Sequence, residues 1–326
     1  MVNHETFYVF YLFFSVLLHK FSKMENILLI FICLLLGFLL QKVKDFPPYS
    51  YKALNQFVIY VSLPAMALYY IPKIQIGIPL LYPLGIAWVG FLVSFSFFYT
   101  LGKWFGWSNK LTGCLILTAG LGNTSFVGFP IVQALYGEKG LETAIIVDQP
   151  GSFVVMATLG VITATVFAKG TPEPKVILNK ILLFPPFLAF ALGCLLNLLQ
   201  TDFSNEFQMV FQKMGSTVTP VALIAVGLQL TIEKRSKHWK FLILGLFFKL
   251  LITPAIFFIL YRVIIGAEGV PIDVSIIEAA MPPMITSAIL ASSYGLKPKL
   301  SSMMIGIGIP LSFLTLAFWY FILQSF

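Results

Sequence analysis

Ten stretches of about 20 mostly apolar residues follow one another along this chain, and they limit its fold more than any other feature. A helix needs about 20 consecutive apolar residues to cross the hydrocarbon core of a bilayer. The sequence therefore predicts an all-α polytopic membrane protein with ten transmembrane helices. These helices are expected approximately at 26–42, 53–72, 78–101, 111–135, 140–168, 176–200, 207–232, 240–264, 275–295 and 300–323.

The composition excludes a soluble fold. Only 10% of the residues are charged and 59% are hydrophobic, and the mean hydropathy is +0.92. A soluble domain carries roughly 25% charged residues, so a soluble chain of this composition would lack a surface for water. The net charge of +8 does not indicate nucleic-acid binding, because the basic residues stand singly or in short clusters between apolar stretches. We expect the lipid bilayer as a partner and no nucleic acid.

The cysteines and histidines offer no catalytic or metal-binding set. They are Cys33, Cys114, Cys194, His4, His19 and His238. The cysteines all fall inside apolar stretches, without a CxxC pair or a disulfide framework. Two histidines stand near the N-terminus and one in a basic loop, so neither a metal cluster nor a Ser/His/Asp arrangement can be assembled. We expect no enzymatic activity, no metal and no cofactor.

The distribution of Lys and Arg predicts the orientation of the chain. If the first apolar stretch begins outside, the inner loops hold fourteen basic residues and the outer loops hold four. Because cytoplasmic loops carry an excess of Lys and Arg, both ends of the ten-helix unit are expected outside. The plasma membrane is the expected location.

Residues 1–23 stand apart from the ten-helix unit. The segment from Phe7 to Phe21 is apolar but short for a span. It can be a signal-like region, an eleventh or accessory helix, or sequence upstream of a start at Met24. The rest of the chain divides into a first five-helix repeat at 24–168, a short cytoplasmic connection at 169–175 and a second repeat at 176–326.

The two halves of the chain contain matching segments in the same order, 156 to 160 positions apart. The matching pairs are Leu36–Leu40 with Leu192–Leu196, Pro64–Leu68 with Pro220–Leu223, and Pro150–Phe153 with Pro310–Phe313. Each unit holds five helices, an odd number, so the second copy must enter the membrane in the opposite orientation. Inverted repeats are typical of secondary carriers, although channels and membrane enzymes can also contain repeats.

Two of the expected helices contain residues that break helices. The fourth has three glycines, an asparagine and a proline within Gly120–Pro130, and the ninth has the double proline Pro282–Pro283. Proline removes a backbone donor and disfavours helix in the residue before it. The freed backbone groups must find partners inside a membrane. A half-helix that starts after a break directs a partial positive charge to the midplane, where it suits a carboxylate.

A kink satisfied by neighbouring helices is the alternative for either break taken singly. Two breaks at equivalent places in two inverted copies favour a substrate site instead. The candidate substrate-binding residues are Gly122, Asn123, Thr124, Ser125, Pro130, Pro282, Pro283 and Met284.

Three ionisable residues fall within the expected spans: Asp148, Lys249 and Glu278. Such residues are costly in a bilayer and are candidates for function. Asp148, followed by Gln149, can bind a coupling proton or cation, or can neutralise Lys249 in a structural charge pair. Glu278 is expected near the outer end of its span, in contact with water. The candidates for coupling to H⁺ or Na⁺ are Asp148, Gln149 and Lys249.

The interrupted segments resemble a known family. The run Gly122–Pro130 looks like the fourth-helix motif of the auxin efflux carrier family, which is grouped with bile acid/sodium symporter-like proteins. Ala279–Pro283, Leu63–Ala65 and Gly227–Leu230 are also similar to segments of that family. The resemblance covers about 24–326. It implies two inverted five-helix repeats whose fourth and ninth helices cross at their breaks, with Asn123 and Pro282–Pro283 at the substrate site.

The same resemblance implies how such a protein would work. The first two helices of each repeat would form a scaffold, with a homodimer through these helices as a candidate assembly. The other three helices of each repeat would form a transport domain that moves like an elevator.

The sequence departs from the plant auxin exporters at two places. The connection between the halves is short, and Met284 rather than an asparagine follows the second break. Auxin-like indole acids and small mono- or dicarboxylates such as malate or malonate are therefore both candidate substrates. An anion channel or a transporter-derived membrane sensor is the alternative function.

Overall fold

The structure is a computed structural model that describes residues 27–47, 49–74, 77–169, 182–230 and 238–326, together with Glu25 and Lys175. The extension 1–23 and most of the connection 169–175 lie outside the described residues. Within them, the chain is helical and contains no strand. Six of the described helices are long and apolar enough to cross a membrane: Ser50–Lys73, Leu81–Trp104, Thr124–Phe167, Asn205–Gln229, Trp239–Ile264 and Pro298–Ser325. The prediction of an all-α polytopic membrane protein is confirmed at this level.

The helices follow one another with short interruptions. The first half contains a helix over Ile27–Leu40 and then α2 (Ser50–Phe57), η1 (Val58–Ser62), α3 (Leu63–Tyr70), η2 (Ile71–Lys73), η3 (Ile78–Leu80), α4 (Leu81–Trp104), α5 (Asn109–Gly120), η4 (Thr124–Gly128), α6 (Phe129–Ile146), η5 (Val147–Phe153), η6 (Met156–Gly160) and α7 (Val161–Phe167). The second half contains α9 (Pro185–Leu198), α10 (Asn205–Gly215), α11 (Val218–Gln229), α12 (Trp239–Phe247), η7 (Phe248–Ile252), α13 (Thr253–Phe258), η8 (Ile259–Ile264), α14 (Val270–Ala279), α15 (Ile285–Ser293) and α16 (Pro298–Ser325).

Three of the π-helical segments stand directly before a proline. The segments η1, η4 and η7 each end two residues before Pro64, Pro130 and Pro254. A proline lacks the N–H that would bond four residues back, and its ring clashes with that carbonyl. The residue before each proline bonds five residues back instead, as when the N–H of Leu63 donates to the C=O of Val58. The helices therefore widen locally and continue, as π-bulges do.

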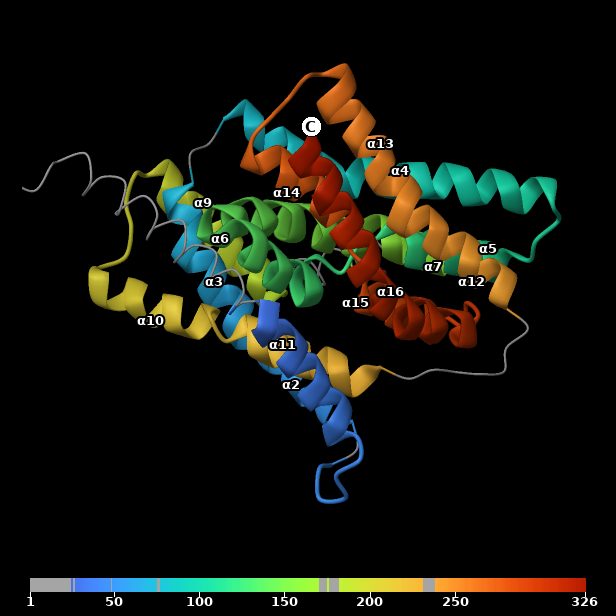
Figure 1. The fold of residues 1–326 in the computed structure, drawn as a ribbon, viewed down its shortest axis with the longest axis horizontal. Helices are drawn as coiled ribbons and strands as arrows, with labels where there is room; N and C mark the ends of the chain where they lie inside the picture. Colours follow the sequence, from blue (N-terminus) through green and yellow to red (C-terminus); the bar gives the residue numbers. More distant parts are fainter. Residues whose placement is uncertain are drawn as a thin grey trace, which may run out of the picture.

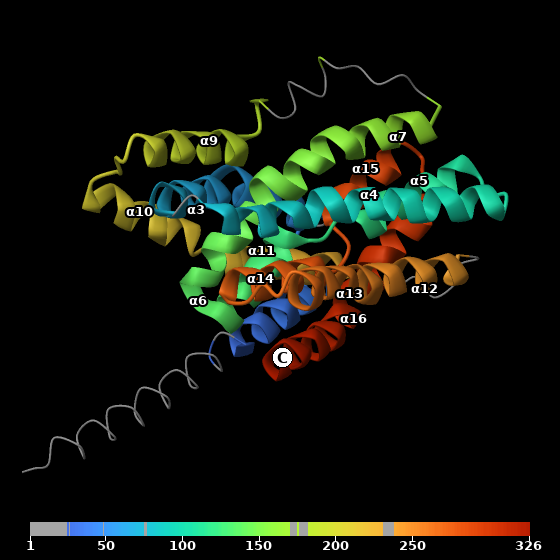
Figure 2. The same ribbon diagram turned by 90° about the horizontal axis from the view of Figure 1, so that it is seen from above.

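The elements form two neighbouring groups in space. Helix α3 packs against α9 and α10, and α2 packs against α11. Both views place α3, α9 and α10 together at one end of the molecule, while α4, α5, α7 and α12 lie at the other (Figures 1 and 2). Helices α6 and α14 pack against each other.

The first helix and α11 cross with their backbones in contact. A Cβ atom on Gly227 would lie 2.9 Å from the Cα of Gly37 and closer still to the carbonyl oxygen of Leu34. In the second half, a Cβ atom on Gly193 would lie 2.8 Å from the Cβ of Ile71, where α9 crosses the end of α3. Gly193 follows Gly37 by 156 positions, and Gly227 follows Ile71 by 156 positions. The two crossings therefore use matching positions.

Side-chain amides close the helix ends next to these crossings. The Nε2 of Gln41 donates to the carbonyl oxygens of Gly227 and Leu230 at 2.8 and 3.2 Å. The Nδ2 of Asn197 contacts the carbonyl oxygens of Ile71, Pro72 and Ile74 at 3.1, 2.9 and 2.7 Å. The carbonyls in the last turn of a helix have no partner within the helix, so both amides satisfy orphan acceptors. Asn197 again follows Gln41 by 156 positions.

We expect Asn197→Ala to lower the free energy of unfolding by ~1–2 kcal/mol, because a buried acceptor cluster loses its donor. Asn197→Asp should cost more, since its carboxylate would face the same carbonyl oxygens. Denaturation of the purified protein in detergent measures both changes. Equal stability of Asn197→Asp and the unaltered chain would contradict the capping role.

Candidate functional site

The two expected breaks meet each other in space. The segment between α5 and η4 and the segment between α14 and α15 run antiparallel, paired at Gly122 and Pro283. The N–H of Asn123 donates to the C=O of Pro282 at 2.8 Å, and the N–H of Met284 donates to the C=O of Leu121 at 3.0 Å. Each unwound segment therefore satisfies part of the other's backbone, as a non-helical segment within a membrane protein requires.

The prolines fit this crossing. Gly122 and Pro283 face each other in a pair that exchanges no hydrogen bond, because the bonds are made by the residues on either side. Backbones approach closely in such a pair, and its N–H groups point away from the partner segment. Proline at this position therefore loses no bond of the crossing. A Cβ atom on Gly122 would lie 3.1 Å from the Nζ of Lys249.

Asn123 caps the half-helix that begins after the first break. Its Oδ1 accepts from the N–H of Phe126 at 3.2 Å, and its C=O accepts from the N–H of Gly128 at 3.0 Å. Its side chain is 2% exposed, and its Nδ2 donates to no atom among the described residues. Buried amide donors are nearly always bonded, so this group is available for a ligand or a water molecule.

A small cavity of about 50 Å³ lies beside Asn123. Its polar lining consists of Asn123, Ser125, Asp148 and Thr286. The Thr286 Oγ1 is buried and, like the Asn123 Nδ2, has no partner among the described residues. The rest of the lining is apolar: Ile59, Leu63, Phe126, Phe153, Met156, Phe184, Met284 and Ile285. The cavity thus combines two unused hydrogen-bonding groups with a hydrophobic wall, in which the rings of Phe153 and Phe184 are stacked.

Asp148 belongs to the hydrogen bonding of the first break. Its Oδ1 accepts from the hydroxyls of Thr124, at 2.6 Å, and Ser125, and its Oδ2 accepts from the Nε2 of Gln149 at 2.7 Å. The carboxylate therefore lies at the N-terminal end of η4, where the helix dipole favours negative charge. Ser125 and Asp148 were both sequence candidates, and the structure brings them together.

Asp148 and Lys249 do not form the charge pair that the sequence suggested. Among the described residues, the ion pair that the structure contains joins Arg262 and Asp273 at 2.7 Å. Lys249 donates from its Nζ to the C=O of Ala279 at 2.9 Å. This is the last residue of α14, and a cation stabilises a helix at that end. The two charges therefore stabilise two different half-helices at the crossing.

The prediction that Glu278 is in contact with water is wrong. Its side chain is 1% exposed, so it is not in contact with water at the end of its span. Its carboxylate lies against Gly128, on which a Cβ atom would be 2.5 Å from its Oε2. The sequence indicated that Glu278 is near the second break, because it stands four residues before the double proline. Its burial depends on which helices pack around it, and the sequence does not give this.

Not every candidate borders the cavity. Met284, Asn123, Ser125 and Asp148 do. Thr124 contacts Asp148, Gly122 and Pro282–Pro283 form the crossing itself, and Pro130 lies in the first turn of α6. The sequence reasoning missed Thr286, although it stands three residues after a double proline, at the start of the second half-helix.

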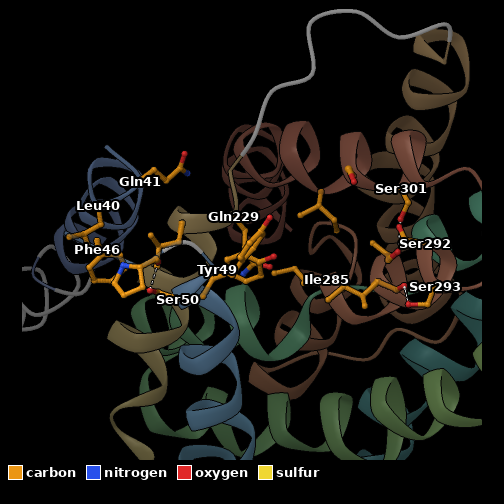
Figure 3. A pocket seen from close by; sticks show the side chains of 17 residues that line it. Leu40, Gln41, Phe46, Tyr49, Ser50, Gln229, Ile285, Ser292, Ser293 and Ser301 are labelled. Carbon is orange, nitrogen blue, oxygen red and sulfur yellow. Dashed lines mark hydrogen bonds between the residues drawn. The ribbon is translucent and has the colours of Figure 1, made fainter. Parts of the chain in front are cut away.

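A larger opening of about 510 Å³ lies at one end of the helix pair α2–α3, where α2 begins. Figure 3 shows Gln41, Tyr49 and Ser50 facing Ser292, Ser293 and Ser301 across it. The sequence reasoning missed these serines, which flank the turn between α15 and α16.

A smaller opening of about 230 Å³ lies at the other end of α2–α3. Its lining includes Met66, Tyr70, Glu138 and Lys213. The small cavity beside Asn123 is lined by Ile59 and Leu63 from the middle of the same helix pair. The three spaces therefore follow one another along α2–α3.

The end with the larger opening is basic. Partial burial and the positive charges of Lys297 and Lys299 lower the pKa of His238, so this residue, directly before α12, lies near the turn before α16. Lys42 and Lys52 directly follow Gln41 and Tyr51 of the lining.

Comparisons with known proteins agree along nearly the whole chain. Residues 22–320 match the family described as membrane transport protein. A protein named as an uncharacterized transporter of Methanocaldococcus jannaschii is 29% identical over 316 residues, which cover 93% of this chain and 99% of the relative. A second uncharacterized transporter, of Methanothermobacter thermautotrophicus, is 27% identical over 306 residues, or 92% and 98% of the two chains.

A plant protein also matches, over a shorter range. A probable auxin efflux carrier component of Oryza sativa subsp. japonica is 29% identical over 156 residues, 46% of this chain and 43% of its own length. The family match spans the crossing, the cavity and both openings. The chain is therefore a membrane transporter that belongs to the membrane transport protein family, the family of the auxin efflux carriers.

Proposed function

We propose that this protein is a secondary transporter of organic anions. The observation that carries the proposal is the cavity at the crossing, where the Asn123 Nδ2 and the Thr286 Oγ1 are buried and have no hydrogen-bond partner among the described residues. Both groups can donate a hydrogen bond to a carboxylate, and hydrogen bonds to charged groups are among the stronger ones in proteins.

The second half-helix supplies the positive end of the site. Helix α15 begins at Ile285, and the N–H groups of its first turn have no acceptor within the helix. Ile285 and Thr286 line the cavity, so this end points an unneutralised dipole at it. The start of η4 is a weaker candidate, because the Asp148 carboxylate already accepts from Thr124 and Ser125 there.

The proposed architecture is two inverted five-helix repeats. The six long helices give seven crossings once Thr124–Phe167 is divided at Gly137, where φ is 66°. In this count α5 belongs to the crossing that ends at Gly137. The shorter helices Ile27–Leu40 and Pro185–Leu198 and the broken crossing α14–α15 bring the number to ten. The matching crossings and amide caps at a spacing of 156 support this proposal.

The proposed mechanism is elevator-type alternating access. The first helix, α2–α3, α9 and α10–α11 would form the scaffold, and the remaining helices would carry the site past it. Two openings at opposite ends of α2–α3, with the cavity between them, support this division. Ile285 lines both the cavity and the larger opening, so the cavity lies next to the opening at the basic end, which is proposed to be cytoplasmic.

The substrate remains a choice between two classes of acid. A space of about 50 Å³ holds only one or a few water molecules, so it must widen for either class. Its stacked Phe153 and Phe184 suit an indole ring, whereas the few polar groups suit a small carboxylate. Cotransport of H⁺ or Na⁺, a plasma-membrane location and a homodimer through the scaffold helices are part of the same proposal.

A binding screen with purified protein tests the proposal. Indole-3-acetate, malate and malonate are the probes, and binding is followed by calorimetry. Thr286→Val should weaken binding while preserving shape, and Thr315→Val, remote from the cavity, is the matched control. Flux in liposomes should saturate and show counterflow, which distinguishes a carrier from a channel. No binding of any acid, or equal binding by both variants, would contradict the proposed site.

We expect Asp148→Asn to fold as stably as the unaltered chain to within ~1 kcal/mol, because an amide can replace each hydrogen bond. The asparagine oxygen can accept from Thr124 and Ser125. Its NH₂ group can donate to the Oε1 of Gln149, which has no partner among the described residues, once the Gln149 amide rotates by 180°. Thermal unfolding in detergent measures the change, and a loss well above that range would show that the negative charge itself holds η4.

A further inference from the structure

A second polar cluster lies at the crossing but does not border the cavity. It consists of Lys249 on η7 and Glu278 on α14, which contact the first broken segment at Gly122 and Gly128 respectively. Lys249 is 3% exposed and Glu278 is 1% exposed. Neither residue is needed to explain how an acid binds at Asn123 and Thr286.

The hydrogen-bonding capacity of this cluster is largely unused. Neither oxygen of Glu278 has a partner among the described residues. Lys249 has three donor hydrogens, and one hydrogen bond is present, to the C=O of Ala279. The two groups are not within the 4.0 Å of an ion pair, although each acts on the other electrostatically. A buried carboxyl group in this situation requires a proton, a water molecule or a cation.

Few other charged groups interact electrostatically with Glu278. From the elements around α14, within the part of the chain that the structure describes, the groups that act on it are Lys249 and the Asp148 carboxylate of η5. Asp273, on the same helix, is paired with Arg262. The tyrosines Tyr136 of α6 and Tyr320 of α16 lie near that ion pair, with ring centroids 6.1 Å apart. Helices α4 and α13 bring no charged group that acts on Glu278.

We propose that Glu278 takes up and releases the proton that is coupled to transport, and that Lys249 is the buried cation that responds to the charge of Glu278. With a proton on Glu278, Lys249 stays on the carbonyl oxygen of Ala279, which is the geometry observed. When the proton leaves to water, the carboxylate attracts the ammonium group away from that carbonyl.

The bond that Lys249 makes connects this step to the crossing. Ala279 is the last residue of α14, and the residues after it form the crossing with Leu121 and Asn123. Movement of Lys249 therefore removes the cap from the half-helix that leads into the site. The inference rests on the proposed transport function only for its coupling; the titration of Glu278 itself does not depend on the cargo.

Infrared difference spectroscopy across a pH titration tests the proton site without a substrate. The full chain in lipid should give a carboxylic acid C=O band that is present in Glu142→Gln and absent in Glu278→Gln. Glu142 is a matched control, since it is only partly buried and lies in the C-terminal half of α6, whereas Glu278 contacts Gly128 just before α6 begins. A band that persists in Glu278→Gln, or that is lost in Asp148→Asn instead, overturns the proposal.

Flux in liposomes tests the coupling, with radiolabelled malonate and indole-3-acetate as probes. Glu278→Gln should lower accumulation driven by a pH gradient about tenfold relative to equilibrium exchange, within the usual range for coupled sites. Glu278→Asp should restore part of this ratio, and Glu142→Gln, at a residue that does not line the cavity, should keep it. A ratio unchanged in Glu278→Gln, or uptake driven by Na⁺ alone, overturns the proposal. If the unaltered chain carries neither acid, the transport proposal fails, and the infrared experiment still decides whether Glu278 holds the proton.

Discussion

Asn123→Ala should lower the affinity for the transported acid about 10- to 100-fold, because hydrogen bonds to charged groups contribute ~1.5–3 kcal/mol. The same change removes the acceptor for the N–H of Phe126 and should destabilise the protein by ~1 kcal/mol, as loss of an N-cap does. Calorimetric titration measures the first effect and thermal unfolding the second.

Asn123→Asp separates these two roles. The carboxylate keeps an acceptor for the N–H of Phe126, so the N-cap is retained, and any loss of stability then reports its burial beside the Asp148 carboxylate. It replaces the free amide donor by an oxygen that repels an anion, so binding should fall at least as much as in Asn123→Ala. If Asn123→Asp binds the acid normally, the Asn123 amide is not a ligand-binding group and its role is only to cap the helix.

Gly227→Ala should destabilise the protein by ~1–3 kcal/mol or more, at the upper end of the range for overpacked sites. The added methyl group would meet the carbonyl oxygen of Leu34, the Cα of Gly37 and the N of Phe38, at 3.0 Å from the last of these. All three are backbone atoms, which cannot move aside like the end of a flexible side chain. The first helix must therefore separate from α11.

Gly160→Ala is the matched control within the same chain. Gly160 has helical angles, with φ −63° and ψ −48°, and the nearest atoms to an added Cβ lie at 3.6 Å or more. Alanine should therefore be neutral or stabilising by ~0.5–1 kcal/mol, because glycine loses more backbone freedom on folding. Unfolding in increasing denaturant compares the two variants. If Gly227→Ala is as stable as Gly160→Ala, the backbones of the first helix and α11 are not in close contact at this crossing.

The two breaks could be located from the sequence because their cause is local. Proline removes a donor wherever it stands, and Gly122 and Pro283 at the centres of the two interruptions indicated where the helices would unwind. Their pairing across 161 positions was expected only from the family resemblance, since no local rule brings Asn123 to Pro282.

The charged residues show the opposite case. Asp148, Lys249 and Glu278 could be recognised as costly in a bilayer, but their partners could not. Asp148 contacts hydroxyls 23 and 24 positions away, and Lys249 contacts a carbonyl 30 positions away. The direction of each side chain depends on π-helical turns near it, which rotate the helix relative to a regular α-helix.

The sequence by itself determined a helical membrane protein with two interrupted helices, because hydrophobicity, segment length and the backbone chemistry of proline and glycine act over a few residues. Only the tertiary structure decided which groups at the crossing are used and which are free. It gives Asp148 three hydrogen bonds and leaves Glu278 with none to any described residue, and it places the Asn123 amide and the Thr286 hydroxyl in the lining of one cavity. The physical reason is that burial and hydrogen bonding in a membrane are properties of the packed helices together, so a residue's neighbours across the fold set its role.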